Sequence, residues 1–131
     1  MKKGYKQMVD EAMAEIVTIT PQQADARRGN EGVVLVDLRD PRELDIEGRI
    51  EGARSCPRGM LEFWIDAESP YHKDYFSSGR EFVFFCAGGL RSALAAKTAQ
   101  DMGLENVSHI EGGMSAWKKA GLPVSGGKPK D

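Results

Sequence analysis

Residues 82–92 read Phe82-Val83-Phe84-Phe85-Cys86-Ala87-Gly88-Gly89-Leu90-Arg91-Ser92. The four apolar residues at the start predict a strand that is buried on both faces, as in a parallel sheet. A turn of small residues follows Cys86, and the alanine-rich segment 92–102 predicts a helix that packs close to that sheet. This order of buried strand, small-residue turn and helix is typical of an α/β fold, with Cys86 at the carboxyl end of the strand.

Cys86 follows the strand at a point where the chain favours negative charge. The N–H groups of a tight turn and the N-terminus of the following helix both attract an anion. Gly88 and Gly89 leave room for these N–H groups to converge, and Arg91 adds a fixed positive charge. Because the thiolate is the nucleophilic form of cysteine, these surroundings favour a catalytic Cys86. The alternative, from the residues alone, is an inert cysteine that ends a buried strand.

Strands and helices alternate along the rest of the chain. Apolar and β-branched runs predict strands over 16–19, 33–36, 53–56, 82–85 and 107–110. Helical spacing and start signals predict helices over 5–16, 21–29, 41–47, 57–66, 92–102 and 113–120. Thr20 and Asp40 each precede a proline and, three positions on, a glutamine or glutamate, which predicts two capping boxes. The pattern predicts a central five-stranded parallel sheet with helices on both faces.

The length of 131 residues suits one domain. We expect a helical extension over 1–14, the α/β domain over 15–125 and a flexible tail over 126–131. The apolar stripe of the N-terminal helix would pack either on its own domain or on a second subunit. Met114 and Trp117, on the last predicted helix, are expected in the core.

Composition excludes several classes of function. The chain is 40% hydrophobic and 29% charged with a net charge of −2, which favours a soluble domain and gives no sign of a nucleic-acid or membrane partner. The apolar runs are too short to span a bilayer, and the N-terminus lacks a signal peptide, so a cytoplasmic location is expected. Two cysteines are then expected to be reduced thiols, and no Cys/His cluster has the spacing of metal ligands.

The segment from Cys86 to Ser92 resembles the active-site loop of the rhodanese-like family, Cys-x-x-Gly-x-Arg-Ser. Further family signatures occur in the expected order, at Val36-Asp37-Leu38-Arg39 with Glu43, at 48–53, at 111–117 and at 121–124. Together they cover about residues 15–125. Two positions depart from the signatures, Arg49 in place of histidine and Cys56 in place of isoleucine, and both lie outside the loop.

The resemblance implies a rhodanese-like three-layer fold and a single-domain sulfurtransferase with no metal or organic cofactor. In that family the loop cysteine, here Cys86, attacks the outer sulfur of a donor such as thiosulfate. The cysteine becomes a persulfide, and the sulfur then passes to cyanide, a thiol or a protein acceptor. The loop would bind the donor and the persulfide through Ala87, Gly88, Gly89, Leu90, Arg91 and Ser92. The apolar Leu90 stands where a cationic side chain would hold thiosulfate more tightly, so thiosulfate is expected to be an assay substrate.

Two other functions remain open at this point. Cysteine-based phosphatases carry one more residue between cysteine and arginine, so the spacing from Cys86 to Arg91 favours sulfur over phosphate or arsenate. A sulfur-relay or docking module for a partner protein would keep the same loop. Ser92 either caps the helix that follows or donates to the sulfur.

The remaining polar and aromatic candidates are assigned from their positions alone. Asp37, Arg39 and Glu43 are expected to form an ion-pair scaffold at a strand end, with an acid or base near Cys86 as the alternative. On the segment 57–66, which would act as a lid, Arg58 and Trp64 are candidates for a wall of the pocket; the alternative is a cover for the core.

Three further residues have no clear catalytic partner in the sequence. Cys56 is expected to be a buried strand residue, with a resolving disulfide to Cys86 as the alternative if their Cα atoms lie within about 7 Å. His72 and His109 are expected at the surface or at strand ends.

Overall fold

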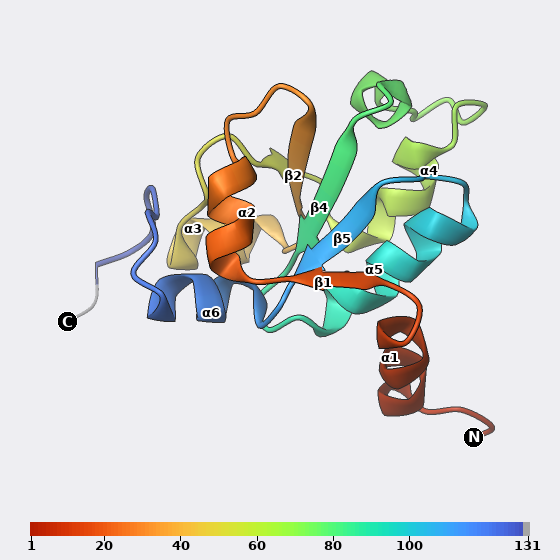
Figure 1. Cartoon of the computed structure of the whole chain (residues 1–131), viewed down its shortest axis with the longest axis horizontal. Helices are drawn as coiled ribbons and strands as arrows, with labels where there is room; N and C mark the ends of the chain where they lie inside the picture. The colour runs from red at the N-terminus through yellow and green to blue at the C-terminus, as the bar shows by residue number, and fades with distance from the viewer. Residues whose placement is uncertain (130–131) are drawn as a thin grey trace.

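A five-stranded parallel sheet forms the centre of the chain, in the order β1-β5-β4-β2-β3 (Figure 1). The structure is a computed structural model and describes residues 1–129; residues 130–131 of the predicted tail lie outside this part. The strands are β1 (Val17–Ile19), β2 (Val33–Asp37), β3 (Arg54–Ser55), β4 (Glu81–Phe85) and β5 (Val107–Ile110). The predicted α/β fold with five parallel strands is therefore confirmed.

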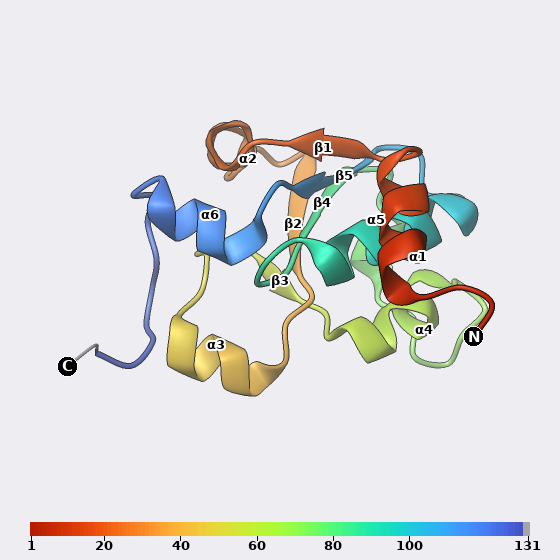
Figure 2. The same ribbon diagram turned by 90° about the horizontal axis from the view of Figure 1, so that it is seen from below.

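Helices cover both faces of this sheet, as Figures 1 and 2 show. The α-helices are α1 (Tyr5–Met13), α2 (Pro21–Arg27), α3 (Pro41–Glu47), α4 (Leu61–Ile65), α5 (Leu90–Asp101) and α6 (Gly113–Lys119). Two short 3₁₀ helices are η1 (Arg58–Met60) and η2 (Asp74–Ser77). Helices α1 and α4 pack on α5 over one face, and α2 packs on α6 over the other. Among residues 1–129, no helix has both the length and the apolar character needed to cross a membrane.

Side chains of β4 alternate between two separate cores. Phe82, Phe84 and Cys86 point into the core on the α5 side, whereas Val83 and Phe85 point into the core with α6. This period of two is the ordinary geometry of a strand. It places Cys86 on the same face of the sheet as α5. Trp117 is fully buried and Met114 is 3% exposed, as expected for core residues.

Start signals in the sequence form the helix caps as predicted. The Thr20 hydroxyl accepts from the N–H of Gln23, and the Gln23 side chain accepts from the N–H of Thr20. Asp40 and Glu43 form the second capping box at the start of α3. This cap fixes the backbone of Glu43 close to the carboxyl end of β2.

Several predicted boundaries differ from the structure. Helix α1 ends at Met13 rather than at 16, because the last turn tightens and the N–H of Glu15 bonds only three residues back, to Ala12. The strand predicted over 53–56 is only Arg54–Ser55, although the N–H of Cys56 still donates to the Asp37 carbonyl at 2.9 Å.

Two predicted helices also differ in extent. Helix α5 begins at Leu90, two residues earlier than predicted, because Gly89 takes a left-handed conformation with φ of +100° and caps it. The predicted lid helix over 57–66 is divided into η1 and α4.

Both ends of the described chain contact the domain. Val9 and Ala12 of α1 are buried where α1 packs on α5, so part of the apolar stripe is used within the chain. At the other end, Ser125 forms an antiparallel bridge with Arg49, and the N–H of Lys128 donates to the carbonyl of Ile46 at 2.9 Å.

Candidate active site

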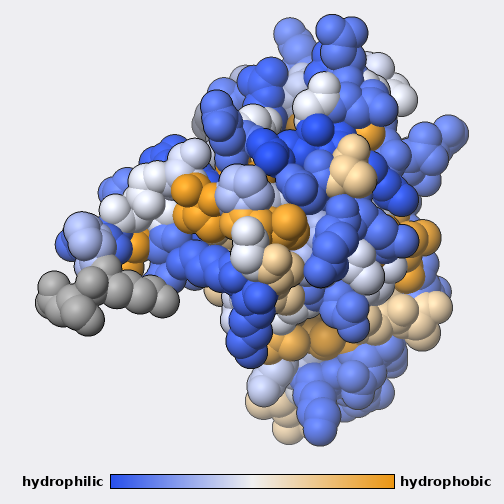
Figure 3. Space-filling view, turned by 60° about the vertical axis from the view of Figure 1, so that its left-hand side comes forward, coloured by the Kyte–Doolittle hydropathy of each residue, from blue (hydrophilic) through white to orange (hydrophobic). Residues whose placement is uncertain are grey.

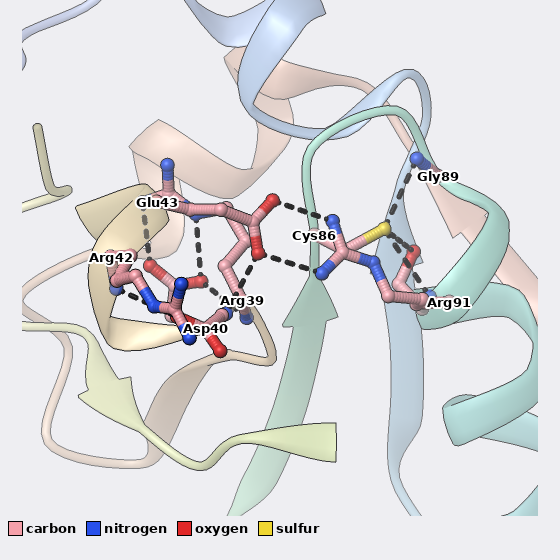
Figure 4. A network of polar contacts seen from close by, with 9 residues as sticks. Arg39, Asp40, Arg42, Glu43, Cys86, Gly89 and Arg91 are labelled. Carbon is pink, nitrogen blue, oxygen red and sulfur yellow. Dashed lines mark hydrogen bonds and ion pairs between the residues drawn. The ribbon is translucent and has the colours of Figure 1, made fainter. Parts of the chain in front are cut away.

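Cys86 follows β4 at the carboxyl edge of the sheet and is only 1% exposed. Its Sγ accepts hydrogen bonds from the backbone N–H groups of Gly89 at 3.2 Å and Ser92 at 3.4 Å. The Ser92 hydroxyl oxygen lies 3.6 Å from the same sulfur. Figure 4 shows the sulfur directed toward Gly89 and the start of α5. Donors that converge on one sulfur suit a thiolate or another sulfur that carries negative charge.

The first turn of α6 holds the loop in this shape. Its N–H groups at Met114 and Ser115 donate to the carbonyls of Cys86 at 2.8 Å and Ala87 at 3.0 Å. Because the N–H and C=O of a trans peptide point in opposite directions, this anchorage turns the N–H groups of Ala87 and Gly88 away from α6. A Cβ at Gly113 would lie 2.3 Å from the Cys86 carbonyl oxygen, so only glycine permits this approach.

Arg91, in the first turn of α5, pairs with Glu43 of α3. The guanidinium donates two hydrogen bonds to the carboxylate, at 2.8 and 2.9 Å, as Figure 4 shows. These bonds lower the pKa of Glu43 to about 2. They also raise the pKa of Arg91, to which the nearby Cys86 sulfur adds. Arg91 is therefore a fixed positive charge that lies between α3 and the sulfur.

Asp37 and Arg39 form a buried ion pair at the end of β2. The Asp37 carboxylate accepts from Nε of Arg39 at 3.0 Å and from Nη2 at 2.8 Å. Nη2 also donates to the Gly48 carbonyl at 2.9 Å, and Arg39 is 1% exposed. This arrangement supports the predicted scaffold for these two residues. Glu43, predicted in the same scaffold, instead connects to the loop through Arg91.

A cavity of about 560 Å³ opens between α3 and α6, next to the loop residue Ala87. Ile46 and Met114 give it an apolar part. Its charged lining consists of four cations and two carboxylates: Arg39, Arg42, Lys118, Lys119, Glu43 and Glu47. Figure 3 views this side of the molecule and shows hydrophobic surface enclosed by hydrophilic surface. The cavity has room for a small, negatively charged reactant.

His109 is a site residue that the sequence prediction missed. It was expected at the surface or at a strand end, but it is 2% exposed within β5. Its Nδ1 lies 2.9 Å from the hydroxyl of Ser92, which contacts Cys86. Burial lowers the pKa of His109. The sequence offers one signal, a histidine within a short apolar strand, but the contact depends on strand register.

Arg58 and Trp64 are not among the described residues that line the cavity beside Ala87. Arg58 pairs with Glu62 at 2.8 Å, four residues on. Trp64 lines a different cavity with Arg54 and Tyr75. The structure therefore does not bring these two side chains into the wall of the cavity next to the loop.

Cys56 and His72 also have surroundings of their own. Cys56 is fully buried, and burial raises its pKa to about 12, so the thiol stays protonated near neutral pH. His72 contacts the Trp64 carbonyl through Nδ1 at 2.9 Å and the Ser77 hydroxyl through Nε2 at 2.8 Å.

Comparison with known proteins gives a family match over most of the chain. The family model for the rhodanese-like domain matches residues 20–120. The thiosulfate sulfurtransferase GlpE of Ectopseudomonas mendocina is 31% identical over 109 residues, which cover 81% of this chain and 88% of that protein. The uncharacterized protein slr1261 of Synechocystis is 35% identical over 82% of this chain, but the match covers only 55% of the relative's length.

Two solved structures extend the comparison. A protein of unknown function from Rhodopseudomonas palustris, described as a possible tyrosine phosphatase, is 58% identical with a TM-score of 0.92, over 95% of this chain and 96% of that one. The polysulfide-sulfur transferase homodimer from Wolinella succinogenes is 30% identical with a TM-score of 0.70, over 92% of this chain and 85% of that one.

Proposed function

Because the chain belongs to the rhodanese-like domain family, we propose that it is a sulfurtransferase that carries sulfane sulfur as a persulfide on Cys86. The observation that carries this proposal is the set of contacts at one sulfur atom. Two backbone N–H groups and one hydroxyl surround Sγ of Cys86, and Arg91 lies close by with its positive charge fixed by Glu43. These groups can stabilise negative charge on the attacking thiolate.

The proposed reaction has two balanced steps. The Cys86 thiolate attacks the outer sulfur of a donor such as thiosulfate, the S–S bond of the donor breaks, and sulfite leaves with the electron pair. The product is a persulfide anion on Cys86. Cyanide or an acceptor thiolate then attacks the outer sulfur, the persulfide bond breaks, and Cys86 returns as a thiolate. No oxidant or reductant is consumed.

The surroundings of Cys86 suggest the class of donor. Since Cys86 is only 1% exposed, a donor must present a narrow terminal sulfur rather than a bulky group. The cavity next to Ala87 would hold the rest of the reactant, with Arg42 and Lys119 facing its negative charge. Thiosulfate and polysulfide, the substrates in the names of two relatives, both fit this description. The acceptor is cyanide or a thiol, including a thiol on a partner protein. We also propose a cytoplasmic location, because a thiol that must stay free to accept sulfur requires a reducing compartment.

Phosphatase chemistry is the second candidate, because the Rhodopseudomonas palustris protein that is 58% identical is described in those terms. A phosphatase loop must surround a tetrahedral phosphate with N–H groups. Here four residues separate Cys86 from Arg91, and two of the loop's N–H groups are already directed at the sulfur itself. This short loop favours sulfur as the transferred group.

One assay separates the two functions. Purified protein is given thiosulfate and cyanide, and separately p-nitrophenyl phosphate, alongside a Cys86→Ser variant. We expect thiocyanate from the wild type and only the uncatalysed rate from Cys86→Ser, because an alcohol cannot form a persulfide. Phosphate release faster than thiocyanate formation would instead assign the phosphatase. If neither product forms, a polysulfide donor with a thiol acceptor tests the sulfur-relay function.

A further inference from the structure

A buried chain of hydrogen bonds leads from Cys86 to the edge of the sheet. Sγ of Cys86 lies 3.6 Å from the Ser92 hydroxyl, which lies 2.9 Å from Nδ1 of His109. On the other side of the ring, Nε2 lies 3.1 Å from the Thr18 hydroxyl. Cys86, Ser92 and His109 are each no more than 2% exposed, whereas Thr18 is exposed on the edge strand β1. The chain therefore connects a buried thiol to water.

Strand register is what assembles this chain. His109 pairs with Phe84 of β4 on one side and with Thr18 of β1 on the other. Paired residues of parallel strands point to the same face, and Cys86 follows Phe84 by two residues. All these side chains therefore point toward α5, whose first turn supplies Ser92.

The His109 ring has hydroxyls on both nitrogens, so either of its neutral tautomers finds partners. With Cys86 as a thiol, S–H donates to the Ser92 oxygen, Ser92 O–H donates to Nδ1, and Nε2–H donates to Thr18. With Cys86 as a thiolate, every bond reverses: Thr18 O–H donates to Nε2, Nδ1–H donates to Ser92, and Ser92 O–H donates to the sulfur. The two charge states of Cys86 thus require opposite tautomers of His109.

We propose that His109 is a positioning residue for Cys86, and that the chain of Ser92, His109 and Thr18 relays the thiol proton to water at the sheet edge. The sulfur gives its proton to Ser92, Ser92 gives its own to Nδ1, Nε2 gives its own to Thr18, and Thr18 releases one to water. Each hydroxyl oxygen ends with one proton, as before, and the imidazole still holds one proton, which has moved from Nε2 to Nδ1. The transfer leaves the Ser92 hydroxyl directed at the new thiolate.

The charged groups near this chain lie on the sulfur side. Arg91 of α5 lies next to Cys86 and pairs with Glu43 of α3, and this pairing keeps both ionised over the pH range in which a thiol titrates. The contacts of the His109 ring on α5 and β1 are hydroxyls. Burial lowers the pKa of His109, which keeps the ring neutral at neutral pH. What can change when Cys86 ionises is therefore which of the two ring nitrogens carries the proton.

This inference rests on the proposed role of Cys86, but its test needs no sulfur donor. The ¹⁵N signals of the two histidines are recorded from pH 5 to pH 10, while thiolate absorbance in the ultraviolet follows Cys86. We expect the His109 signals to change from the Nε2–H to the Nδ1–H tautomer at the same midpoint as the thiolate signal. His72, which contacts the Trp64 carbonyl and Ser77, serves as the internal control and should not follow that midpoint. A His109 tautomer that stays constant while Cys86 ionises would overturn the relay.

Variants give a second readout that a purely structural role would not move. The rate of Cys86 alkylation by iodoacetamide is measured against pH. His109→Phe keeps a ring of similar volume but removes both nitrogens, and we expect alkylation at pH 7 to slow roughly tenfold as the profile moves to higher pH, since a hydrogen bond to an ionised group is lost. His109→Asn, which can still donate at the Nδ1 position, should restore most of the rate.

A matched control and a contrary result complete the alkylation test. His72→Phe should leave the alkylation profile unchanged, because His72 contacts the α4–η2 segment and not the relay. A His109→Phe profile equal to wild type, in a folded variant, would contradict the proposal. Alkylation measures the reactivity of the Cys86 thiol and not sulfur transfer. If His109→Phe changes the alkylation profile as expected but the wild type transfers no sulfur, the proposed function is wrong and the relay is not.

Discussion

The Arg91 guanidinium and the Glu43 carboxylate join α5 to α3 through two hydrogen bonds, of 2.8 and 2.9 Å, across 48 residues of sequence. Arg91 belongs to the loop that contains the candidate nucleophile, and Glu43 belongs to a helix fixed by its capping box. The loop charge is thereby held by a separate element of the domain. Glu43 is expected from the sequence in a scaffold with Asp37 and Arg39. The structure shows that it also holds Arg91 in position.

Replacing Glu43 by glutamine should weaken sulfur transfer without unfolding the domain. Glutamine cannot accept both guanidinium hydrogen bonds, so Arg91 loses its fixed position beside Cys86. We expect kcat/KM for thiosulfate to fall by about tenfold or more, since a misplacement of about 1 Å in an active site can cost roughly a hundredfold. The matched control is Glu81→Gln, which removes a pair with Arg27 of similar exposure at the opposite end of β4. Equal activity losses in the two variants would contradict a specific role for Glu43.

Acid should remove the stabilisation that Glu43 provides. Its pKa is lowered to about 2 in the folded chain, below the ordinary value of 4.5, so its contribution is complete above pH 4.5 and is lost as pH falls toward 2. Because both side chains are about one-third exposed, screening by solvent limits the contribution to roughly 1 kcal/mol. Urea unfolding at several pH values should show wild type and Glu43→Gln converge between pH 4.5 and 2. A constant difference across this range would mean that the pair does not act through charge.

The sequence predicted the parts of this site that depend on local chemistry. The buried strand 82–85, the small-residue turn after Cys86 and the two capping boxes all follow from residues close together in the chain. The predicted lid suggests Arg58 and Trp64 for a pocket wall, but that segment divides into η1 and α4. Arg58 pairs there with Glu62, and Trp64 lines a different cavity.

Contacts that depend on register and on distant elements could not be predicted in the same way. His109 reaches Ser92 only because β5 pairs with β4 so that His109 lies beside Phe84. A one-residue shift would turn the histidine to the other face of the sheet. The pairing of Glu43 with Arg91 likewise requires the position of α3 against the loop, which the spacing in sequence does not provide.

Gly113→Ala should disrupt the loop more than a matched glycine substitution elsewhere. Gly113 has φ of +56°, and an added Cβ would meet the carbonyl oxygens of Cys86 at 2.3 Å and Ala87 at 2.9 Å. Gly52→Ala is the control, because Gly52 has φ of +89° but open space around it. Each variant has the backbone strain of about 1–2 kcal/mol, and only Gly113→Ala adds the clash. Thermal unfolding and transfer assays should both show the larger loss in Gly113→Ala; equal losses would mean that this close approach does not matter.

Cys56 should take no part in sulfur transfer. Burial raises its pKa to about 12, so at pH 8 its thiol is almost entirely protonated and cannot resolve a persulfide by forming a disulfide with Cys86. We expect Cys56→Ala to keep wild-type transfer activity while losing about 1 kcal/mol of stability through the small cavity it leaves. Peptide mapping after oxidation checks the same point, and a disulfide between Cys56 and Cys86 would disprove it.

The role of Cys86 as the carrier of the transferred sulfur can be measured by the intact mass of the protein after thiosulfate treatment in the absence of any acceptor. We expect a gain of one sulfur atom, located on Cys86 by peptide mapping, removed by cyanide with formation of thiocyanate, and absent in Cys86→Ser. An unchanged mass after treatment with both thiosulfate and polysulfide, or an added sulfur on Cys56 instead, would contradict it.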